Sequence, residues 1–533
     1  MGTKTYNNYQ DLITFSRASS GYALRPVSYG AERVTNGTFD SDTTGWAITS
    51  SAVLAVDSNR LKITSTGAMG ARQDIPTQVG KLYRFEWDYT EGTLSSSNVS
   101  VRAYPSGDFT GESNETPATT GYINFVATGS EARIYFRNDG TGTSFFDNAS
   151  VKEVTFDESD GTLTLFEHLN NIPRVEYDAD GNRLGLLIEE SRTNLVQQSE
   201  NFENVYWSGT SASPDINTVT SPTGQTDGTT VTATGSSYIS KSNIITAQNT
   251  TITFSAFLKA GTVTTVGLHF AGNLGDGAND NCDFNLSNGT VSSEGSSSTA
   301  TIQYVGNGWY RCSNTYTTNG TGSGLDLRIT TSGAGTYYLF GAQAEYASFP
   351  TSYIKTTGST ATRSADLATM SFDNFGHNKK ELTLLVDFDY PNWQNSSNFH
   401  RAVSLGRSTT STNANFGVFN NGGSNPGILR YRVDNSSGTA VFAAANLTGS
   451  NSVTSAKVAL AVKEGQHAIT YNGNTPNTST GGDPELETVD ILAIGARWAE
   501  VSQTLAEYGS CHIKSIKYYP RRLTDAQLQE ITS

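Results

Sequence analysis

Short apolar runs in which every second residue is polar recur along most of the chain, and turn-forming residues separate them. Typical runs are Leu82–Trp87 (LYRFEW), Val99–Ala103 (VSVRA) and Ala132–Phe136 (ARIYF). This period of two predicts strands with one buried face, because successive side chains of a strand point to opposite sides. Only 16% of the 533 residues are charged and 52 are glycine, which suits many short strands joined by tight turns. We therefore predict an all-β chain of antiparallel β-sandwiches.

Two of the predicted sandwiches are similar to each other in sequence order. The first covers residues 31–155 and the second covers residues 196–365. Three segments of the second echo segments of the first in the same order, which favours a duplicated fold. The echoing segments are Asn201–Trp207 with Val34–Trp46, Ile244–Phe257 with Ile75–Trp87, and Gly335–Ala342 with Gly142–Ala149.

The remaining residues divide into a third sandwich and two linking parts. Residues 366–533 contain further strand patterns, beginning with Leu382–Phe388 (LTLLVDF), and form the third predicted sandwich. Residues 156–195 predict a hairpin whose turn contains Asp-Gly, followed by a polar connector. Residues 1–30 have no sustained apolar period, so we predict an N-terminal segment that attaches the chain to another subunit.

The hairpin region also carries a resemblance. Its segments P-R-V-E-Y-D (Pro173–Asp178) and G-L-L-I-E-E-S-R-T-N-L (Gly185–Leu195) resemble segments of tailed-bacteriophage virion proteins, mostly tail fibres and other appendages. Those proteins normally carry F-[ST]-R-A-S a short way upstream, whereas here it is Phe15–Ser19, about 150 residues away. The resemblance therefore implies that the first sandwich is inserted into an N-terminal segment. Asn307–Ser313 and Phe349–Arg363 are similar to further segments of the same proteins.

The sandwiches carry resemblances of their own. The first two resemble galactose-binding-like jelly rolls, which include many carbohydrate-binding modules. The third resembles the concanavalin/laminin-G type, which ends on a strand, a Y-x-R-x-L turn and a short helix that Thr524 is placed to cap. Such jelly rolls often hold a structural Ca²⁺, which implies Asp40 and Asp147 as ligands here. Phe340 stands where Asp147 would align in the second copy, and plain turn or strand-end roles are the alternative.

Charge and cysteine content exclude several classes of function. The net charge of −15 argues against nucleic-acid binding, which needs a basic surface. The three cysteines, Cys282, Cys312 and Cys511, are too few for a disulfide framework, and buried free thiols are favoured over a Cys282–Cys312 pair. No apolar run is long enough to span a bilayer, so no membrane insertion is expected.

Aromatic residues in turn-rich contexts are the candidate glycan-binding residues, because exposed rings stack on sugar faces. The candidates are Trp393 with Asn392 and Tyr390, Trp498 with Arg497, and Trp46, Tyr206 and Trp207. For each ring the alternative is a structural role at the end of a sandwich.

Catalysis is not predicted. The closest approach to a glycosidase carboxylate pair is Asp387 with Asp389, which alternate on one strand and are expected to face solvent. We expect no enzymatic activity and no required cofactor. A structural Ca²⁺ is implied by the resemblance alone.

These observations lead to one functional hypothesis with two alternatives. The chain is expected to be a phage virion protein, a tail or head fibre, that attaches to host-surface polysaccharide. Its partners would be other virion proteins through the N-terminal segment and further copies of itself, after assembly in the host cytoplasm. The alternatives are a purely structural decoration protein and a polysaccharide depolymerase.

Overall fold

The computed structural model describes residues 13–94, 96–104, 120–245, 247, 249–273, 280–318, 324–374, 376–390, 401–407, 416–420, 429–444, 447–448, 454–499, 504–506 and 509–533. Within these residues the elements are antiparallel strands, apart from single 3-10 turns and one helix, α1 (Asp525–Thr532), which confirms the all-β prediction. The chain forms two compact units. Unit 2 is Arg25–Thr164, and unit 1 contains the residues before and after it.

Unit 2 is a sandwich organised around two long strands, β5 and β9. β5 pairs with β9 along its whole length, and β9 continues beyond that pairing. Its core packs Ile63, Phe85 and Phe136 at 0% exposure. The predicted inserted sandwich, residues 31–155, lies within this unit. The strands with residues in unit 2 are β2 (Gly21–Tyr29), β3 (Ala47–Thr49), β4 (Val53–Val56), β5 (Leu61–Pro76), β6 (Leu82–Glu91), β7 (Ser97–Tyr104), β8 (Thr120–Val126), β9 (Glu131–Phe156) and β10 (Thr162–His168).

The second sandwich is the first part of unit 1 after the hairpin, and its strands enclose one core. Cys282 and Cys312 both lie in that core as free thiols, and Cys511 is also free and buried, which confirms the prediction for all three. The strands of the second sandwich are β14 (Ser208–Val219), β15 (Gly228–Ile245), β16 (Thr251–Ala260), β17 (Thr265–Asn273), β18 (Asp280–Asn285), β19 (Thr290–Ser293), β20 (Ser298–Gly306), β21 (Trp309–Thr317), β22 (Gly324–Thr331) and β23 (Ala334–Glu345).

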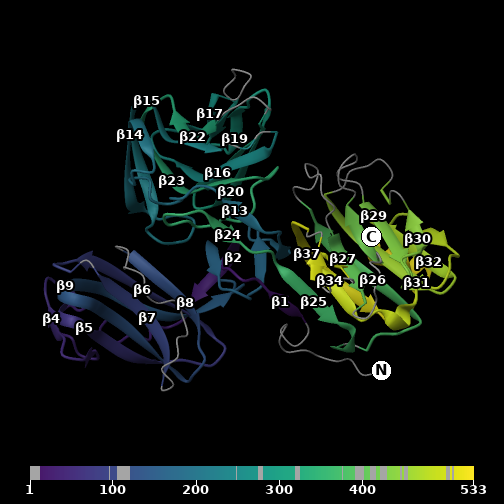
Figure 1. Ribbon diagram of the computed structural model, residues 1–533, viewed down its shortest axis with the longest axis horizontal. Helices are drawn as coiled ribbons and strands as arrows, with labels where there is room; N and C mark the ends of the chain where they lie inside the picture. The colour runs from purple at the N-terminus through teal and green to yellow at the C-terminus, as the bar shows by residue number, and fades with distance from the viewer. Residues whose placement is uncertain are drawn as a thin grey trace. The chain divides into compact units, whose positions relative to one another are not determined.

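The C-terminal sandwich packs two sheets against each other around Leu384, Val433 and Leu460 (Figure 1). One sheet contains, in spatial order, β1 (Thr14–Ser16), β25 (Leu367–Ser371), β34 (Ile491–Ile494), β27 (Arg401–Gly406), β28 (Phe416–Asn420), β29 (Leu429–Asp434) and β30 (Ala440–Ala444). The other contains β11 (Arg174–Tyr177), β12 (Arg183–Ile188), β37 (Cys511–Tyr519), β26 (Glu381–Asp389), β31 (Ser455–Lys463), β32 (Gln466–Tyr471) and β33 (Asn477–Ser479). Two short pairs, β13 (Arg192–Asn194) with β24 (Ala361–Arg363) and β35 (Arg497–Ala499) with β36 (Thr504–Ala506), lie outside these sheets.

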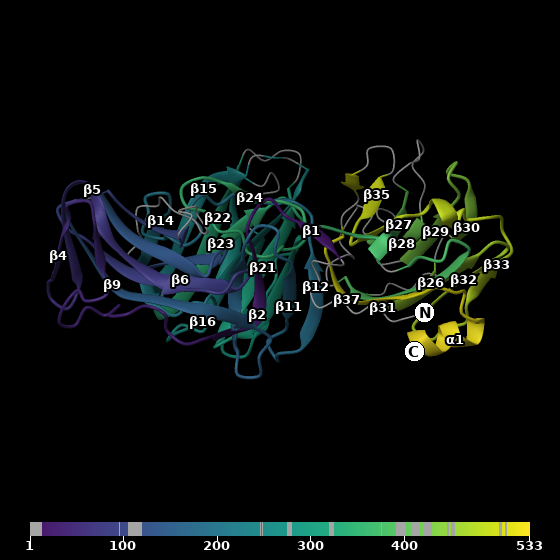
Figure 2. The same cartoon turned by 90° about the horizontal axis from the view of Figure 1, so that it is seen from below.

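The helix α1 lies against strands β31 and β32 of the C-terminal sandwich (Figure 2). Thr524 begins it with a capping box, in which its side chain accepts from the backbone N–H of Gln527. Leu528 is fully buried and packs in a small apolar cluster with Leu385 and Ala459. The predicted cap is therefore confirmed, and the helix covers an otherwise exposed apolar part of the sheet.

The N-terminal segment and the hairpin have structural roles that the sequence did not predict. Residues 14–16 form β1, which pairs with β25 as an edge strand of the C-terminal sandwich. The predicted hairpin forms, with Gly181 in the turn at φ +81°, and its strand β12 pairs with β37. The polar segment after it, predicted as a connector, is partly buried instead, since Glu189 is 4% and Asn194 0% exposed. β1 and the hairpin therefore complete the C-terminal sandwich from a distance in sequence. The first twelve residues of the predicted attachment segment lie outside the described residues.

A cluster of buried charges joins these distant segments. Asp366 accepts from Arg17 at 3.0 Å and from Arg174 at 2.5 Å, and all three side chains have 0% exposure. Glu189 lies 2.9 Å from Arg174 and 3.5 Å from Arg363. Burial alone would raise the pKa of Glu189, but Arg363 and Arg174 hold it well below its usual range. The pairing keeps the cluster charged in a dry environment.

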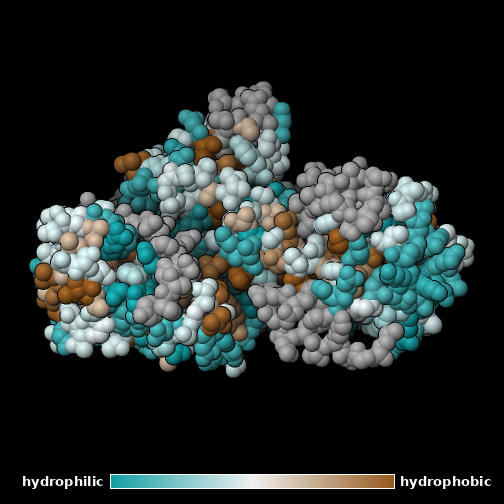
Figure 3. Space-filling view, turned by 60° about the horizontal axis from the view of Figure 1, so that its bottom comes forward, coloured by the Kyte–Doolittle hydropathy of each residue, from teal (hydrophilic) through white to brown (hydrophobic). Residues whose placement is uncertain are grey.

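The outer surface is mainly polar. The visible face in Figure 3 is largely hydrophilic or neutral, with scattered apolar residues. The most exposed large apolar side chains are Val205, Val79, Val53 and Ile48. In the part of the chain that the structure describes, no helix has the length and apolar character to cross a membrane.

Removing one member of the buried cluster is expected to destabilise unit 1 strongly. Asp366→Asn leaves Arg17 and Arg174 facing each other without their shared carboxylate. Loss of one partner from a buried ion pair costs about 3–5 kcal/mol. Chemical denaturation should show this loss, whereas Asp525→Asn, in an exposed pair with Arg522, should change stability by less than about 1 kcal/mol. Equal effects of the two changes would contradict a central role for the cluster.

Unit 1 is expected to fold without unit 2. The chain passes into unit 2 within β2 and returns within β10, and these two strands are neighbours in one sheet. Replacement of residues 25–164 by a short Gly/Ser linker should therefore leave the contacts of unit 1 in place. Thermal unfolding of the shortened chain should retain the transition of unit 1 and lose that of unit 2. Aggregation or loss of both transitions would show that unit 1 depends on the insert.

Candidate functional site

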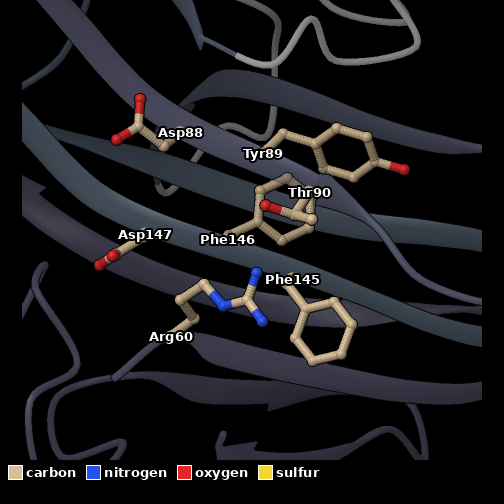
Figure 4. Close-up of a pocket in the computed structure, with 7 residues that line it drawn as sticks. All are labelled: Arg60, Asp88, Tyr89, Thr90, Phe145, Phe146 and Asp147. Atoms are coloured by element: carbon tan, nitrogen blue, oxygen red, sulfur yellow. The ribbon is translucent and has the colours of Figure 1, made fainter. Parts of the chain in front are cut away.

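A pocket of about 350 Å³ opens on unit 2 beside the C-terminal part of β6 and the middle of β9 (Figure 4). Pockets of this size are at the small end of those that hold small-molecule ligands, roughly 300–1,000 Å³. Aromatic, acidic, basic and hydroxyl side chains are all present in its lining. The lining residues are Arg60, Asp88, Tyr89, Thr90, Phe145, Phe146 and Asp147.

Strand pairing brings the two acidic side chains of the pocket together. Asp88 of β6 is directly opposite Asp147 of β9, next to an irregularity in the ladder. Asn148 adopts a left-handed conformation there, with φ 48°. Its side-chain amide donates to Asp88 at 2.7 Å, and its backbone N–H donates to Asp147 at 2.8 Å. This bulge therefore fixes both carboxylates side by side, a use of irregularity that is common near binding sites.

The electrostatic surroundings of Asp147 are unfavourable to its charge. Burial is the main cause that raises the pKa of Asp147, and the nearby carboxylates of Asp88 and Asp40 raise it further. The backbone N–H of Asn148 and the Arg60 guanidinium act in the opposite direction. Two carboxylates, those of Asp88 and Asp147, therefore line the pocket with one guanidinium, and the pocket favours ligands that donate hydrogen bonds to carboxylates.

The other wall of the pocket is aromatic. The guanidinium of Arg60 lies 4.6 Å from the ring centroid of Phe145, and the ammonium of Lys62 lies 5.8 Å from it. Figure 4 shows Arg60 between this ring and the carboxylate of Asp147. Tyr89 is 7% exposed, and its hydroxyl has no hydrogen-bond partner among the described residues. The ring of Phe145 is half-buried. Such a ring beside carboxylates and a guanidinium is the combination that recognises the apolar face and the hydroxyls of a sugar.

The implied calcium site does not assemble around its two predicted ligands. Asp147 is in the pocket, and Asp40 is near enough to influence its pKa, but Asp40 is exposed and accepts from Thr38 at 2.8 Å. Across the described parts of the chain, no group of three or more histidine, cysteine, aspartate or glutamate side chains is arranged to hold a metal ion. Two carboxylates are fewer than the six to eight oxygen ligands that Ca²⁺ takes, so calcium binding stays a prediction.

The predicted aromatic candidates of the two similar sandwiches are largely buried. Trp46 is 7% exposed and stacks on Phe136 with centroids 5.2 Å apart. Trp207 is 6% exposed and donates through Nε1 to the carbonyl of Gln198. Tyr206 is half-buried, with the Lys241 ammonium 4.6 Å from its ring centroid. Core packing therefore uses the faces of Trp46 and Trp207 that a sugar would need.

The C-terminal candidates are also not arranged as a sugar platform. Tyr390 is fully buried and packs against Phe388, so its ring is not available to a ligand. Trp498 is half-buried against Gly406 and donates through Nε1 to the carbonyl of Arg407 at 3.3 Å, while its neighbour Arg497 is also half-buried. Trp393 and Asn392 lie outside the described residues, and so their role stays a prediction.

The carboxylates considered for catalysis do not form a free pair. Asp389 makes an ion pair with Lys514 at 2.7 Å. Burial is the main cause that raises the pKa of Asp387, and Lys514 and Lys457 oppose it. These contacts are typical of a charged outer face of a sheet, where neighbouring strands alternate in sign.

Of the residues proposed from sequence, only Asp147 lines the pocket, and it was proposed as a metal ligand. Asp88 and Phe145 were missed because they come from two strands far apart in sequence, and Arg60 because it lies in the turn before β5. The available signal for Asp88 and Phe145 was their outward position in the alternating runs LYRFEWDYTE and GTSFFDNA. Alternation gives the face of the sheet but not the partner strand, so the pocket could not be assembled from it.

Comparison with known proteins gives only distant structural likenesses. No family model and no curated protein match the chain. One similar structure is the carbohydrate-binding module CBM40 of Ruminococcus gnavus IT-sialidase bound to α2,3-sialyllactose, with 17% identity, 29% of this chain and 83% of that chain covered, and a TM-score of 0.23. Another is the CBM22-1–CBM22-2 tandem of Paenibacillus barcinonensis Xyn10C, with 11% identity and a TM-score of 0.21. The match covers 61% of this chain and 99% of that chain. A third is Trypanosoma rangeli sialidase, with 9% identity and a TM-score of 0.23. The match covers 96% of this chain and 94% of that chain. TM-scores this low carry no argument about what this chain binds.

Neutralising Asp147 is expected to stabilise unit 2 at neutral pH. Because the pKa of Asp147 is raised on folding, the folded state binds its proton more tightly than the unfolded chain does. Ionisation then lowers stability as pH rises through the raised pKa, and the loss persists above it. Asp147→Asn removes this loss while keeping an acceptor for Asn148. The melting temperature of the variant should be higher than that of the wild type at about pH 7. The two melting temperatures should coincide near pH 3, below the ordinary aspartate pKa of about 3.9. A variant less stable at pH 7 would contradict this electrostatic assignment.

Proposed function

We propose that the chain binds host-surface glycans as an attachment protein of a tailed-phage virion, without cleaving them. The observation that carries the binding part is the pocket of unit 2, where Asp88, Asp147 and Arg60 stand beside the ring of Phe145. Carboxylates accept from sugar hydroxyls, the guanidinium donates to them, and the ring covers an apolar sugar face. The same group of side chains has no evident role in the core of the unit.

The virion part of the proposal is supported by the segments that resemble phage proteins. Phe15–Ser19, Pro173–Asp178, Gly185–Leu195 and Phe349–Arg363 supply Arg17, Arg174, Glu189 and Arg363 to the buried charge cluster. The resemblance therefore concerns residues that build the junction of the N-terminal strand, the hairpin and the C-terminal sandwich. A shared junction of this kind indicates a shared architecture, onto which different sandwiches can be placed.

Attachment through such a pocket needs many copies. A small, open sugar site binds weakly by itself, and several copies on one particle raise the effective affinity through multivalency. We propose that the chain forms homo-oligomers and contacts other virion proteins through its N-terminal residues. Assembly in the host cytoplasm agrees with the three free, buried thiols.

The alternatives make different demands on the pocket. A structural decoration protein needs no polar pocket with paired carboxylates on its surface. A depolymerase needs an acid and a second carboxylate about 5–10 Å apart across a scissile bond. Asp88 and Asp147 both accept hydrogen bonds from Asn148 at the bulge, and this use as fixed acceptors favours binding.

Binding of the full chain to a glycan array and to host cells tests this proposal. Asp88→Ala/Asp147→Ala should lower the apparent affinity by about tenfold or more, since each hydrogen bond to a charged group contributes about 1.5–3 kcal/mol. Trp498→Ala is the matched control and should leave binding unchanged. The polysaccharide should be recovered at its original length after incubation. Cleavage would favour the depolymerase, and absence of saturable binding at high valency would favour the structural protein.

A further inference from the structure

The two similar sandwiches share one local structure at the position of the pocket. In unit 2, the ladder of β6 and β9 shifts register between Glu86 and Asp88. In the second sandwich, the ladder of β16 and β23 shifts register between Ser255 and Phe257. The residues opposite the shifted positions are Asp147 in unit 2 and Phe340 in the second sandwich. The pair Asp88–Asp147 therefore corresponds to the pair Phe257–Phe340.

The left-handed residue that follows is also equivalent in the two sandwiches. Asn148 has φ 48° one residue after Asp147, and Gly341 has φ 62° one residue after Phe340. The two bulges thus have the same backbone conformation and differ in their side chains. The group that packs over the bulge of the second sandwich therefore indicates the size and shape of ligand that the bulge of unit 2 can accept.

In the second sandwich that space is filled by a ring of the chain itself. The centroid of the Tyr353 ring lies 5.5 Å from that of Phe340 and 6.0 Å from that of Phe257, and the latter contact is edge-on. A Cβ on Gly341 would lie 3.1 Å from the Tyr353 ring. Tyr353 is 1% exposed. A six-membered ring therefore fits directly over this bulge.

Hydrogen bonds hold the segment that carries this ring across the sheet. Gln343 accepts from the backbone N–H of Ile354 at 2.7 Å, and Glu345 accepts from that of Thr351 at 2.8 Å. Gln343 and Glu345 continue β23 beyond the bulge, where β9 of unit 2 has Ser150 and Lys152. This face of the second sandwich thus binds an extended stretch of polypeptide.

Unit 2 has replaced the two apolar residues under the ring by carboxylates. Two of the equivalent positions, Asp88 and Asp147, line the open pocket there, and the pocket extends from them toward Phe145 and Arg60. An aromatic ring placed over these two carboxylates would remove their hydration and donate no hydrogen bonds in return. A ring that carries hydroxyl donors at its edge would satisfy them.

We infer that the pocket of unit 2 receives a single pyranose ring of an uncharged or amino sugar, in the place that Tyr353 fills in the second sandwich. This inference rests on the proposed glycan binding and names the class of sugar. Asp88 and Asp147 line the place with one guanidinium, that of Arg60, and the nearby ammonium of Lys62 is paired with Asp57. Carboxylates are therefore in excess, and a carboxylate-bearing sugar such as a sialic or uronic acid is repelled.

Two variants test the inference with the full chain on an array of neutral, amino and acidic sugars. Asp88→Phe/Asp147→Phe gives unit 2 the side chains that the second sandwich has at the same bulge, so it should fold and should fill the pocket. Binding of neutral or amino sugars should fall at least tenfold. Glu158→Phe, an exposed change elsewhere on unit 2, is the control and should bind as the wild type does.

Asp88→Asn/Asp147→Asn keeps the shape of the pocket and removes its charge. It should narrow the preference for neutral over acidic sugars, and it serves as the test if the phenylalanine variant does not fold. Stronger wild-type binding to acidic sugars, or neutral-sugar binding that survives the phenylalanine variant, overturns the inference while glycan binding stands. Displacement of bound sugar by a peptide of residues 349–356, but not by free monosaccharides, overturns it in favour of a peptide ligand. Absence of binding to every glycan overturns the proposed function itself.

Discussion

The shared carboxylate of Asp366 is the interaction on which the architecture of unit 1 depends. It joins Arg17 from the N-terminal segment to Arg174 from the hairpin, and both side chains are fully buried. Asp366 is the buried carboxylate that Arg17 and Arg174 share, and its loss would leave buried charge undercompensated, which is far more costly than a lost surface contact. The geometry of a guanidinium–carboxylate pair is specific, so the cluster specifies which segments meet.

The two similar sandwiches have the same bulge with different side chains. The bulge lies between paired strands, and the side chains at two positions decide whether the sheet face is closed or open. With Phe257 and Phe340, the face is covered by Tyr353 and becomes part of the interior of unit 1. With Asp88 and Asp147, the same face remains in contact with solvent and forms a polar pocket. The difference lies in transfer energies of side chains and needs no change of fold.

The sequence was sufficient for features that depend on local periodicity. Alternating runs such as VSVRA predicted strands, Asp-Gly predicted the hairpin turn, and Thr524 predicted a helix cap. It was insufficient where the outcome depends on which distant strands pair. Trp46 and Trp207 lie in turn-rich segments that suggested exposure, but large rings near the end of a sandwich gain more by covering the core. The meeting of Asp88 with Asp147 follows from a ladder between strands that the sequence does not link.

The position of β1 has a consequence for the order in which the protein can fold during synthesis. Arg17 and its partner Asp366 are 349 positions apart, so β1 leaves the ribosome long before the sheet that receives it. The strand pairings of unit 2 and of the second sandwich are made within their own stretches of the chain, so both can fold while β1 is still unpaired. The last step is then the closure of the C-terminal sandwich over a strand made at the outset. An N-terminal edge strand that must stay free for this time is the part of the chain most exposed to wrong pairing with a neighbouring copy.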